Sequence, residues 1–201
     1  MATTFIGIDL AGSPKRPTGV CLIRGRRVVT EVVYGDDELF GFIGRVGATN
    51  IGIDAPLFLP LGRCCLRDDC TCPRTIHFRE CDLELRRRGI RFFPITLGPM
   101  RQLTARGMKL SEVLSKKGHT VLETYPGAAQ DLWGIPRQRD VSGLRRGLRR
   151  FVEFNKRGIS CHELDAVTCA LLAKFHRHGR TELIGRADEG WMVLPRTYKE
   201  L

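Results

Sequence analysis

The chain has 201 residues, of which 42% are hydrophobic and 27% charged, and this suits one domain with a sizeable core, expected over residues 1–201. No apolar run approaches the about 20 residues that cross a bilayer, and the first residues lack the basic and apolar regions of a signal peptide, so we expect a cytoplasmic protein without membrane association. The formal net charge of +11 favours a polyanionic partner such as nucleic acid, although a basic surface without one fits about equally well.

The first part of the chain predicts three strands, a helix and a fourth strand. Glycine at position 25 marks a tight turn between the second and third strands, and acidic residues occupy the first turn of the helix. The fourth strand is apolar on both faces, as in the centre of a sheet. The strands are expected at residues 4–12, 18–25, 26–35 and 48–57, and the helix at residues 36–46.

The second part of the chain alternates helices with strands. Residues 56–76 are irregular and rich in Pro, Gly and Cys. Helices are predicted at residues 76–89, 100–117, 141–158 and 162–179, with a fifth strand at 118–127 and a closing hairpin at 181–195. The pattern indicates an α/β fold with a mixed five-stranded sheet flanked by helices. Residues 56–117 are expected to form a Cys-rich helical insertion between strands four and five.

Four acidic residues lie where a strand ends or a buried helix begins. Asp9, Asp54 and Glu123 each follow an apolar strand run, and Asp165 lies near the start of the helix over residues 162–179. Ligands of open α/β sheets gather beyond the strand ends, where grouped acids repel each other unless a divalent cation intervenes. Oxygen ligands suit Mg²⁺ or Mn²⁺. Each acid alone is better explained as a cap or turn residue, but the four together favour a metal site.

Two groups of basic residues are candidates for phosphate contacts. Arg145, Arg146, Arg149 and Arg150 form a stripe on one helix face, and this pattern supports a nucleic-acid contact and a solvated helix surface equally. Arg79, Asp82 and Arg86 share a face of the helix over residues 76–89. There the substrate-binding interpretation is slightly favoured over a surface salt bridge.

Cysteines crowd into the irregular segment before that helix. Cys64, Cys65, Cys70, Cys72 and His77 could bind a structural Zn²⁺ or an iron–sulfur centre. Their spacing departs from the usual paired C-x₂-C arrays, so the zinc interpretation is the less favoured one. Absence of an export signal argues against a disulfide framework for these residues.

The residues around the acids resemble a known family. The chain is similar to the predicted nucleases of RNase H-like fold that form the domain of unknown function 429. The matching stretches follow the family's order over nearly the whole chain: GIDLAG (7–12), TGV (18–20), IGIDAPL (51–57), RECD (79–82), RRRGI (86–90), ETYPG (123–127), LDAVTCALLA (164–173) and GRADEGWMVLP (185–195).

The resemblance implies an antiparallel three-stranded meander extended by parallel strands, with helices on both faces. It also implies a metal-dependent acidic centre in which acids stand on the first strand, the fourth strand and a C-terminal helix. Asp9, Asp54 and Asp165 match these positions, and Glu123 belongs to the family's ETYP motif on the fifth strand. In such centres two metal ions activate a water and stabilise the leaving oxygen of a phosphodiester, and Asp9 would bridge them.

The expected function is therefore cleavage of nucleic acid by a Mg²⁺- or Mn²⁺-dependent nuclease. A non-catalytic nucleic-acid-binding module of the same fold is the first alternative, because fold does not dictate function. A phosphotransferase is the second, because actin-like sugar kinases open with a similar GIDLG-type strand. Those kinases repeat the core in a second domain, for which 201 residues leave no room.

Overall fold

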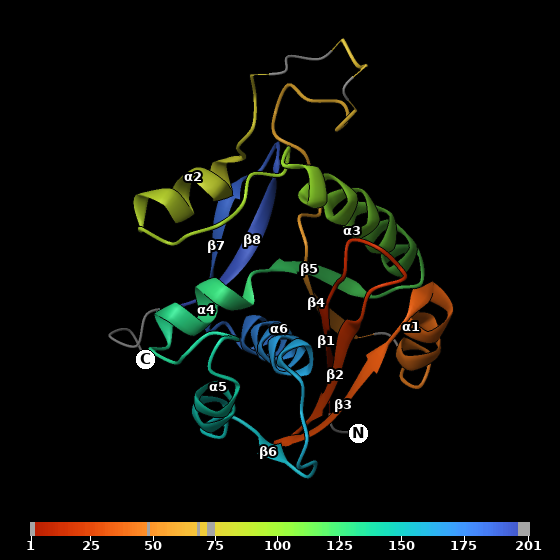
Figure 1. Ribbon diagram of the computed structural model, residues 1–201, viewed down its shortest axis with the longest axis vertical. Helices are drawn as coiled ribbons and strands as arrows, with labels where there is room; N and C mark the ends of the chain where they lie inside the picture. The colour runs from red at the N-terminus through yellow and green to blue at the C-terminus, as the bar shows by residue number, and fades with distance from the viewer. Residues whose placement is uncertain (1–2, 48, 68, 72–74, 197–201) are drawn as a thin grey trace.

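A mixed β-sheet forms the centre of the protein in a computed structural model that describes residues 3–47, 49–67, 69–71 and 75–196 (Figure 1). The described residues form eight strands in the order β6-β3-β2-β1-β4-β5-β8-β7. Strand β1 pairs antiparallel with β2 and parallel with β4, and β5 continues the parallel part. The strands are β1 (Thr4–Asp9), β2 (Thr18–Arg24), β3 (Arg27–Val33), β4 (Asn50–Asp54), β5 (Thr120–Thr124), β6 (Glu153–Phe154), β7 (Thr181–Arg186) and β8 (Gly190–Pro195).

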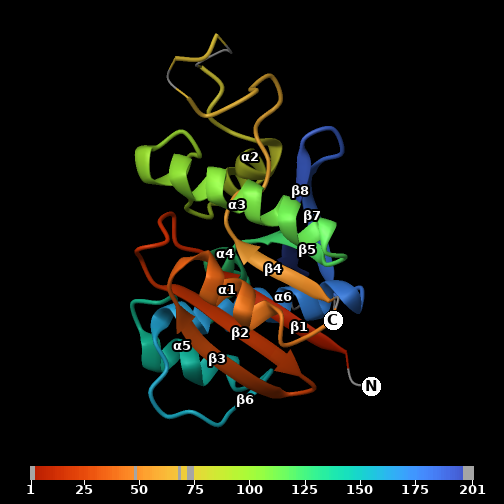
Figure 2. The same cartoon turned by 90° about the vertical axis from the view of Figure 1, so that its right-hand side faces the viewer.

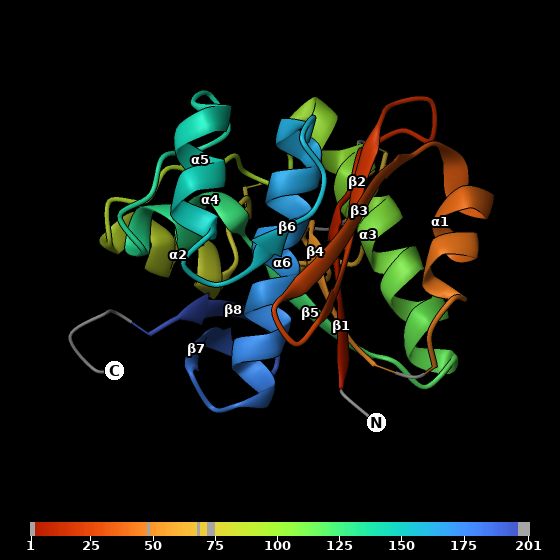
Figure 3. The same ribbon diagram turned by 90° about the horizontal axis from the view of Figure 1, so that it is seen from below.

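Helices cover both faces of this sheet. Figures 2 and 3 show α1 and α3 on one face and α4, α5 and α6 on the other. The helices are α1 (Gly35–Ile43), α2 (Glu80–Arg87), α3 (Gly98–Lys116), α4 (Pro126–Leu132), α5 (Val141–Leu148) and α6 (Cys161–Arg177). Helix α2 lies beside β7. None of the described helices is both long and apolar enough to cross a membrane.

Helix α6 lies directly against the sheet because glycines face it. A Cβ atom on Gly7 of β1 would lie 1.9 Å from the carbonyl oxygen of Ala166. On Gly52 of β4 it would lie 2.4 Å from the carbonyl oxygen of Cys169. Both distances are far below van der Waals contact, so only glycine permits this approach. The two glycines are neighbours in register, and the aspartates two residues later lie on the same face.

The two faces of the sheet have separate apolar cores. Phe5 and Val193 pack with α6 on one face, together with Leu144 and Leu148 of α5. On the other face, alternate strand residues pack against α1 and α3: Ile6, Ile8, Ile51 and Ile53. Successive apolar residues of β1 and β4 point to opposite faces of the sheet, and both faces are buried, as the continuous apolar runs of the sequence predict.

The mixed α/β fold is confirmed, but the prediction of a five-stranded sheet is wrong. The C-terminal hairpin, β7 and β8, joins the sheet because β8 pairs parallel with β5. Strand β6 pairs with β3 at the opposite edge, since the helix predicted over residues 141–158 ends at Leu148. Helix α4 begins at Pro126, within the last two residues of the strand predicted over 118–127, and the rest of the helix lies where no element was predicted. The predicted insertion contains α2, α3 and the Cys-rich segment, all between β4 and β5.

Candidate active site

Three polar side chains form a row across the carboxyl ends of adjacent parallel strands. Asp9 on β1 is in register with Asp54 on β4, and Asp54 is in register with Thr124 on β5. In parallel strands, residues at one level point to the same face, here the face that α6 covers. Thr124 is buried, and its hydroxyl has no hydrogen-bond partner among the described residues. The nearby Cys169 thiol interacts with that hydroxyl but lacks hydrogen-bond geometry.

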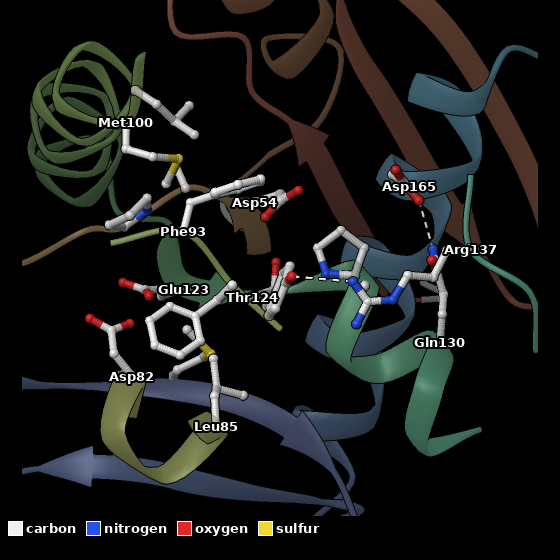
Figure 4. Close-up of a pocket in the computed structure, with 18 of the residues that line it drawn as sticks. Asp54, Asp82, Leu85, Phe93, Met100, Glu123, Thr124, Gln130, Arg137 and Asp165 are labelled. Atoms are coloured by element: carbon white, nitrogen blue, oxygen red, sulfur yellow. Dashed lines mark hydrogen bonds between the residues drawn. The ribbon is translucent and has the colours of Figure 1, made fainter. Parts of the chain in front are cut away.

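Asp165 reaches the same region from α6. Its side chain is buried, and its Oδ1 atom accepts a hydrogen bond of 2.6 Å from Nε2 of Gln130, a buried residue of α4. Figure 4 shows this pair on one side of a cavity, with Asp54 nearby. Helix α6 is held in place at its N-terminus by a capping box in which Ser160 and Glu163 exchange hydrogen bonds. Glu163 therefore supports the helix.

Burial and mutual repulsion keep these acids from ionising together. The pKa of Asp54 lies well above its usual range because of burial first and then the charges of Asp9, Asp165 and Glu123. Burial, followed by the charge of Asp9, raises the pKa of Asp165 to about 7, against the opposing hydrogen bond from Gln130. A nearby cation would stabilise the ionised forms of Asp54 and Asp165, so the donor set fits a divalent metal ion.

The carboxylate oxygens of the three acids are not all close to one another. Among the described residues, the one group of three His, Cys, Asp or Glu ligand atoms within 4.8 Å of one another is formed by cysteines. The oxygens of Asp9, Asp54 and Asp165 are therefore farther apart than that.

His162 is the nearest basic partner of the acidic row. Its Nδ1 atom lies 2.7 Å from Oδ2 of Asp9, and this hydrogen bond raises the pKa of the imidazole. The side chain is 40% exposed and, with Asp9 and Arg16, lines a solvent-accessible hollow. Asp9 thus borders this hollow, whereas Asp54 and Asp165 line a separate cavity.

Glu123 lies on the other face of the sheet. It is one residue before Thr124, at the level of Ile53, so its side chain points away from the row formed by Asp9, Asp54 and Thr124. Its Oε2 atom accepts hydrogen bonds from the Leu57 amide at 2.7 Å and from Nη1 of Arg79 at 2.8 Å. Burial raises the pKa of Glu123, and Arg79 opposes that shift.

Arg79 and Asp82 complete a buried ion-pair network with Glu123. The guanidinium of Arg79 donates to both carboxylate oxygens of Asp82, at 3.0 and 2.8 Å, and its ring-stacking partner is Phe58. All three charged side chains are buried, so Arg79 already has its anionic partners. The network ties the start of α2 to β5 and to the loop after Asp54.

The other predicted phosphate contacts lie apart from the acids. Arg86 is exposed on α2 above the Phe78 ring. Arg145 donates to the carbonyls of Lys156 and Arg157, and Arg149 is exposed just after α5. None of these three arginines lines the cavity beside Asp54 and Asp165.

Three of the predicted sulfur ligands do come together. The Sγ atoms of Cys64, Cys65 and Cys70 all lie within 4.8 Å of one another, with 3.2 Å between Cys64 and Cys70. His77 is outside this group, and its Nδ1 atom lies 2.8 Å from Oγ1 of Thr96. Cys72 lies outside the described residues.

A cavity of about 260 Å³ opens beside the acids. Figure 4 shows Asp54 between two groups, with Asp82 and Glu123 on one side and Asp165, Gln130 and Arg137 on the other. Apolar side chains, among them Phe93 and Met100, complete the wall. The cavity therefore touches both the acidic row and the buried ion-pair network.

The sequence profile of a protein family matches residues 7–189, described as "Protein of unknown function (DUF429)". The chain belongs to the DUF429 family. This confirms the resemblance found in the sequence, because the match covers most of the chain. No curated protein gives a significant match to this DUF429 protein.

One solved structure shares the fold of this DUF429 protein. It is T. thermophilus RuvC in complex with Holliday junction substrate, with a TM-score of 0.55 and 12% sequence identity. The similarity covers 88% of this chain and 97% of the RuvC chain. At so low an identity the likeness shows a shared fold, the RNase H-like one that the sequence predicts.

Sequence reasoning missed three residues around the acids. Thr124 stands beside the predicted Glu123, and only the strand register shows that it is the residue level with Asp54. Gln130 lies on the unpredicted α4, and Arg137 follows that helix. Pro126 could have indicated α4, because proline is common at the first position of a helix as well as at the end of a strand.

Proposed function

We propose that this DUF429 protein is a metal-dependent nuclease whose centre is formed by Asp9, Asp54 and Asp165. The observation that supports this most is the register of Asp9 with Asp54, with Asp165 facing them from α6. Burial and neighbouring carboxylates raise the pKa values of Asp54 and Asp165, and the three acids form a suitable donor set for Mg²⁺ or Mn²⁺. The net charge of +11 and the likeness of the fold to RuvC support nucleic acid as the substrate.

The bound ion would polarise the phosphodiester and lower the pKa of an attacking water. The chain's own residues then have separate tasks. Gln130 orients Asp165 through its amide hydrogen bond, and His162 holds Asp9 through Nδ1. His162 and Arg16 line the hollow over Asp9 and can bind a phosphate oxygen there.

Glu123 remains predicted as a fourth ligand, but its surroundings favour a supporting role. It holds the Leu57 amide and the Arg79 guanidinium on the face opposite Asp54. In this role Glu123 fixes the loop that follows Asp54, and Arg79 and Asp82 fix Glu123. Arg86, Arg145 and Arg149 remain predicted contacts for the substrate outside the centre.

Cleavage of a labelled panel in Mg²⁺ and then Mn²⁺ tests the proposal. The panel holds branched DNA, single strands, RNA and an RNA–DNA hybrid, with wild type, Asp9→Asn and the exposed-acid control Asp37→Asn. We expect cutting that needs the metal and Asp9 but not Asp37. Binding without cutting by wild type would favour the non-catalytic module, and absence of both would favour a small phosphorylated substrate.

We also propose that Cys64, Cys65 and Cys70 are ligands of a structural Zn²⁺. Three thiolates that already lie within 4.8 Å need little movement to reach Zn–S distances of about 2.3 Å. The described part of the segment between β4 and α2 has no helix or strand, so a metal would stabilise it. This segment leads directly into Arg79, which links the zinc site to the carboxylates.

Metal analysis of protein purified without added zinc tests this site. We expect one equivalent of zinc in wild type and in Cys161→Ser, a cysteine of α6, but a loss in Cys65→Ser. One equivalent of iron instead would indicate an iron–sulfur centre. Wild type without stoichiometric zinc or iron would contradict a metal role for these cysteines.

A further inference from the structure

One wall of the cavity beside Asp54 is aromatic and takes no part in the proposed metal site. Phe92, Phe93 and Tyr125 line it, and Phe93 is 68% exposed. The Tyr125 hydroxyl donates to the Arg91 carbonyl, and the Arg137 guanidinium lies 5.8 Å from the centre of the Tyr125 ring. An exposed phenylalanine beside a fixed tyrosine and a cation offers stacking surface to a planar ring.

The same cavity is lined by two polar residues of β5. Thr124 lines it, and the buried Thr124 hydroxyl has no hydrogen-bond partner among the described residues. Glu123 also lines the cavity, and its Oε2 atom accepts from the Leu57 amide and from Arg79. An orphaned buried hydroxyl costs stability, so Thr124 points to a ligand that satisfies it.

The size of the cavity limits what can enter. Its volume of about 260 Å³ lies just below the range of sites for drug-sized ligands, roughly 300–1,000 Å³. A double helix cannot enter such a space, whereas one ring system with its edge groups fits. A nucleobase removed from its stack has faces for aromatic contacts and an edge for hydrogen bonds.

The charges of the cavity select among the bases. Asp54 and Asp165 belong to the proposed metal centre and Asp82 pairs with Arg79, so Glu123 is the carboxylate of the wall that is available to a base. A carboxylate accepts hydrogen bonds from exocyclic amino groups. Adenine, cytosine and guanine carry an amino group, and thymine and uracil do not.

We propose that this cavity binds one unpaired, amino-bearing nucleobase of the strand whose phosphate lies at Asp9, Asp54 and Asp165. The inference rests on the proposed nuclease function and names its substrate class, namely a strand that is single or locally unpaired at the cleavage point. Phe93 stacks on the base, Glu123 and Thr124 receive its edge, and Arg137 lies beside the phosphate backbone.

A fluorescent adenine analogue tests this without turnover. A short single strand carrying one 2-aminopurine is titrated with the full chain in Ca²⁺, and the fluorescence and the affinity are recorded. We expect quenching on binding by wild type, and binding weaker by about 5- to 150-fold in Phe93→Ala, because stacking of one base on one aromatic ring has that effect. Val29→Ala, an exposed apolar residue of β3, is the control and should match wild type.

A second comparison uses wild type alone. A strand with an abasic site in place of the probe base should bind more weakly than the adenine strand by a similar factor, because it loses the stacking face. A strand with thymine there should also bind more weakly, because thymine lacks the amino group. Equal affinity for all three strands, with Phe93→Ala equal to wild type, would overturn the base pocket. Tighter binding of adenosine monophosphate than of the strand would also overturn it, in favour of a small phosphorylated ligand.

The outcome is separable from that of the proposed function. Metal-dependent cleavage that is the same for every base and in Phe93→Ala would support the nuclease proposal and contradict the base pocket. Quenching that depends on Phe93, without cleavage in Mg²⁺ or Mn²⁺, would support the base pocket in a non-catalytic binding module. It would contradict the nuclease proposal.

Discussion

Arg79 and Glu123 are 44 residues apart in the chain, yet their side chains form an ion pair of 2.8 Å in which each is 2% exposed. The pair joins the Cys-rich insertion to the strand next to Asp54. Glu123 also accepts a hydrogen bond from the Leu57 amide, so the pair links the start of α2 to the loop that follows Asp54. The insertion is thus in contact with the candidate active site through buried polar groups.

Arg79→Met should lower the free energy of unfolding by about 3–5 kcal/mol, because it leaves two carboxylates buried without their cation. Urea unfolding of the variant and of wild type measures this loss. Arg86→Met, an exposed arginine two turns along the same helix, is the matched control and should change the free energy by less than about 0.5 kcal/mol. A loss below 1 kcal/mol in Arg79→Met would show that the network carries little stability.

Gly52→Ala should destabilise the protein by at least about 2 kcal/mol, because the new Cβ atom would meet the Cys169 carbonyl of α6 and force the helix off the sheet. The displacement would also move Asp165, so any cleavage should fall with it. Thermal unfolding and cleavage rate are the two measurements. Gly41→Ala, on α1 with open space around the added atom, should be neutral or slightly stabilising. Equal effects of the two substitutions would argue against the close approach of α6.

The sequence predicts part of this arrangement. Asp9 and Asp54 are identifiable because the same apolar strand pattern precedes both, and the glycine two residues earlier in each strand is the one that admits α6. The face on which Glu123 points is not identifiable, since the short strand β5 has apolar or partly buried residues on both sides. Register with β4 decides it, and register is a property of the assembled sheet.

The helix predicted over residues 141–158 shows another limit of sequence reasoning. Leu144, Leu148, Phe151 and Val152 have helical spacing, yet the helix ends at Leu148. Phe151 and Val152 reach the same apolar core from the chain beyond the helix, where Phe151 packs 4.9 Å from Trp133 between ring centres. Hydrophobic periodicity indicates which residues are buried. It does not show whether a continuous helix, or a shorter helix followed by irregular chain, buries them.

Mg²⁺ should stabilise wild type and leave Asp54→Asn unaffected, if the acidic row binds the ion. A ligand at 100 times its dissociation constant adds about 2.7 kcal/mol to the free energy of unfolding. Without metal, Asp54→Asn should be more stable than wild type, since it removes one of three mutually repelling acids. Thermal unfolding with and without Mg²⁺ measures both effects. Stabilisation by Mg²⁺ that persists in Asp54→Asn would place the ion elsewhere.

His162→Ala should slow metal-dependent cleavage by about 10- to 100-fold, because partners that orient a metal-binding carboxylate contribute that much. The loss follows from the hydrogen bond of 2.7 Å between His162 and Asp9. Single-turnover rates at saturating metal and substrate measure it separately from binding. His176→Ala is the matched control, because His176 lies on the same helix near its other end and contacts Thr181. Should His162→Ala cleave as fast as His176→Ala, Asp9 would not depend on His162 for its orientation.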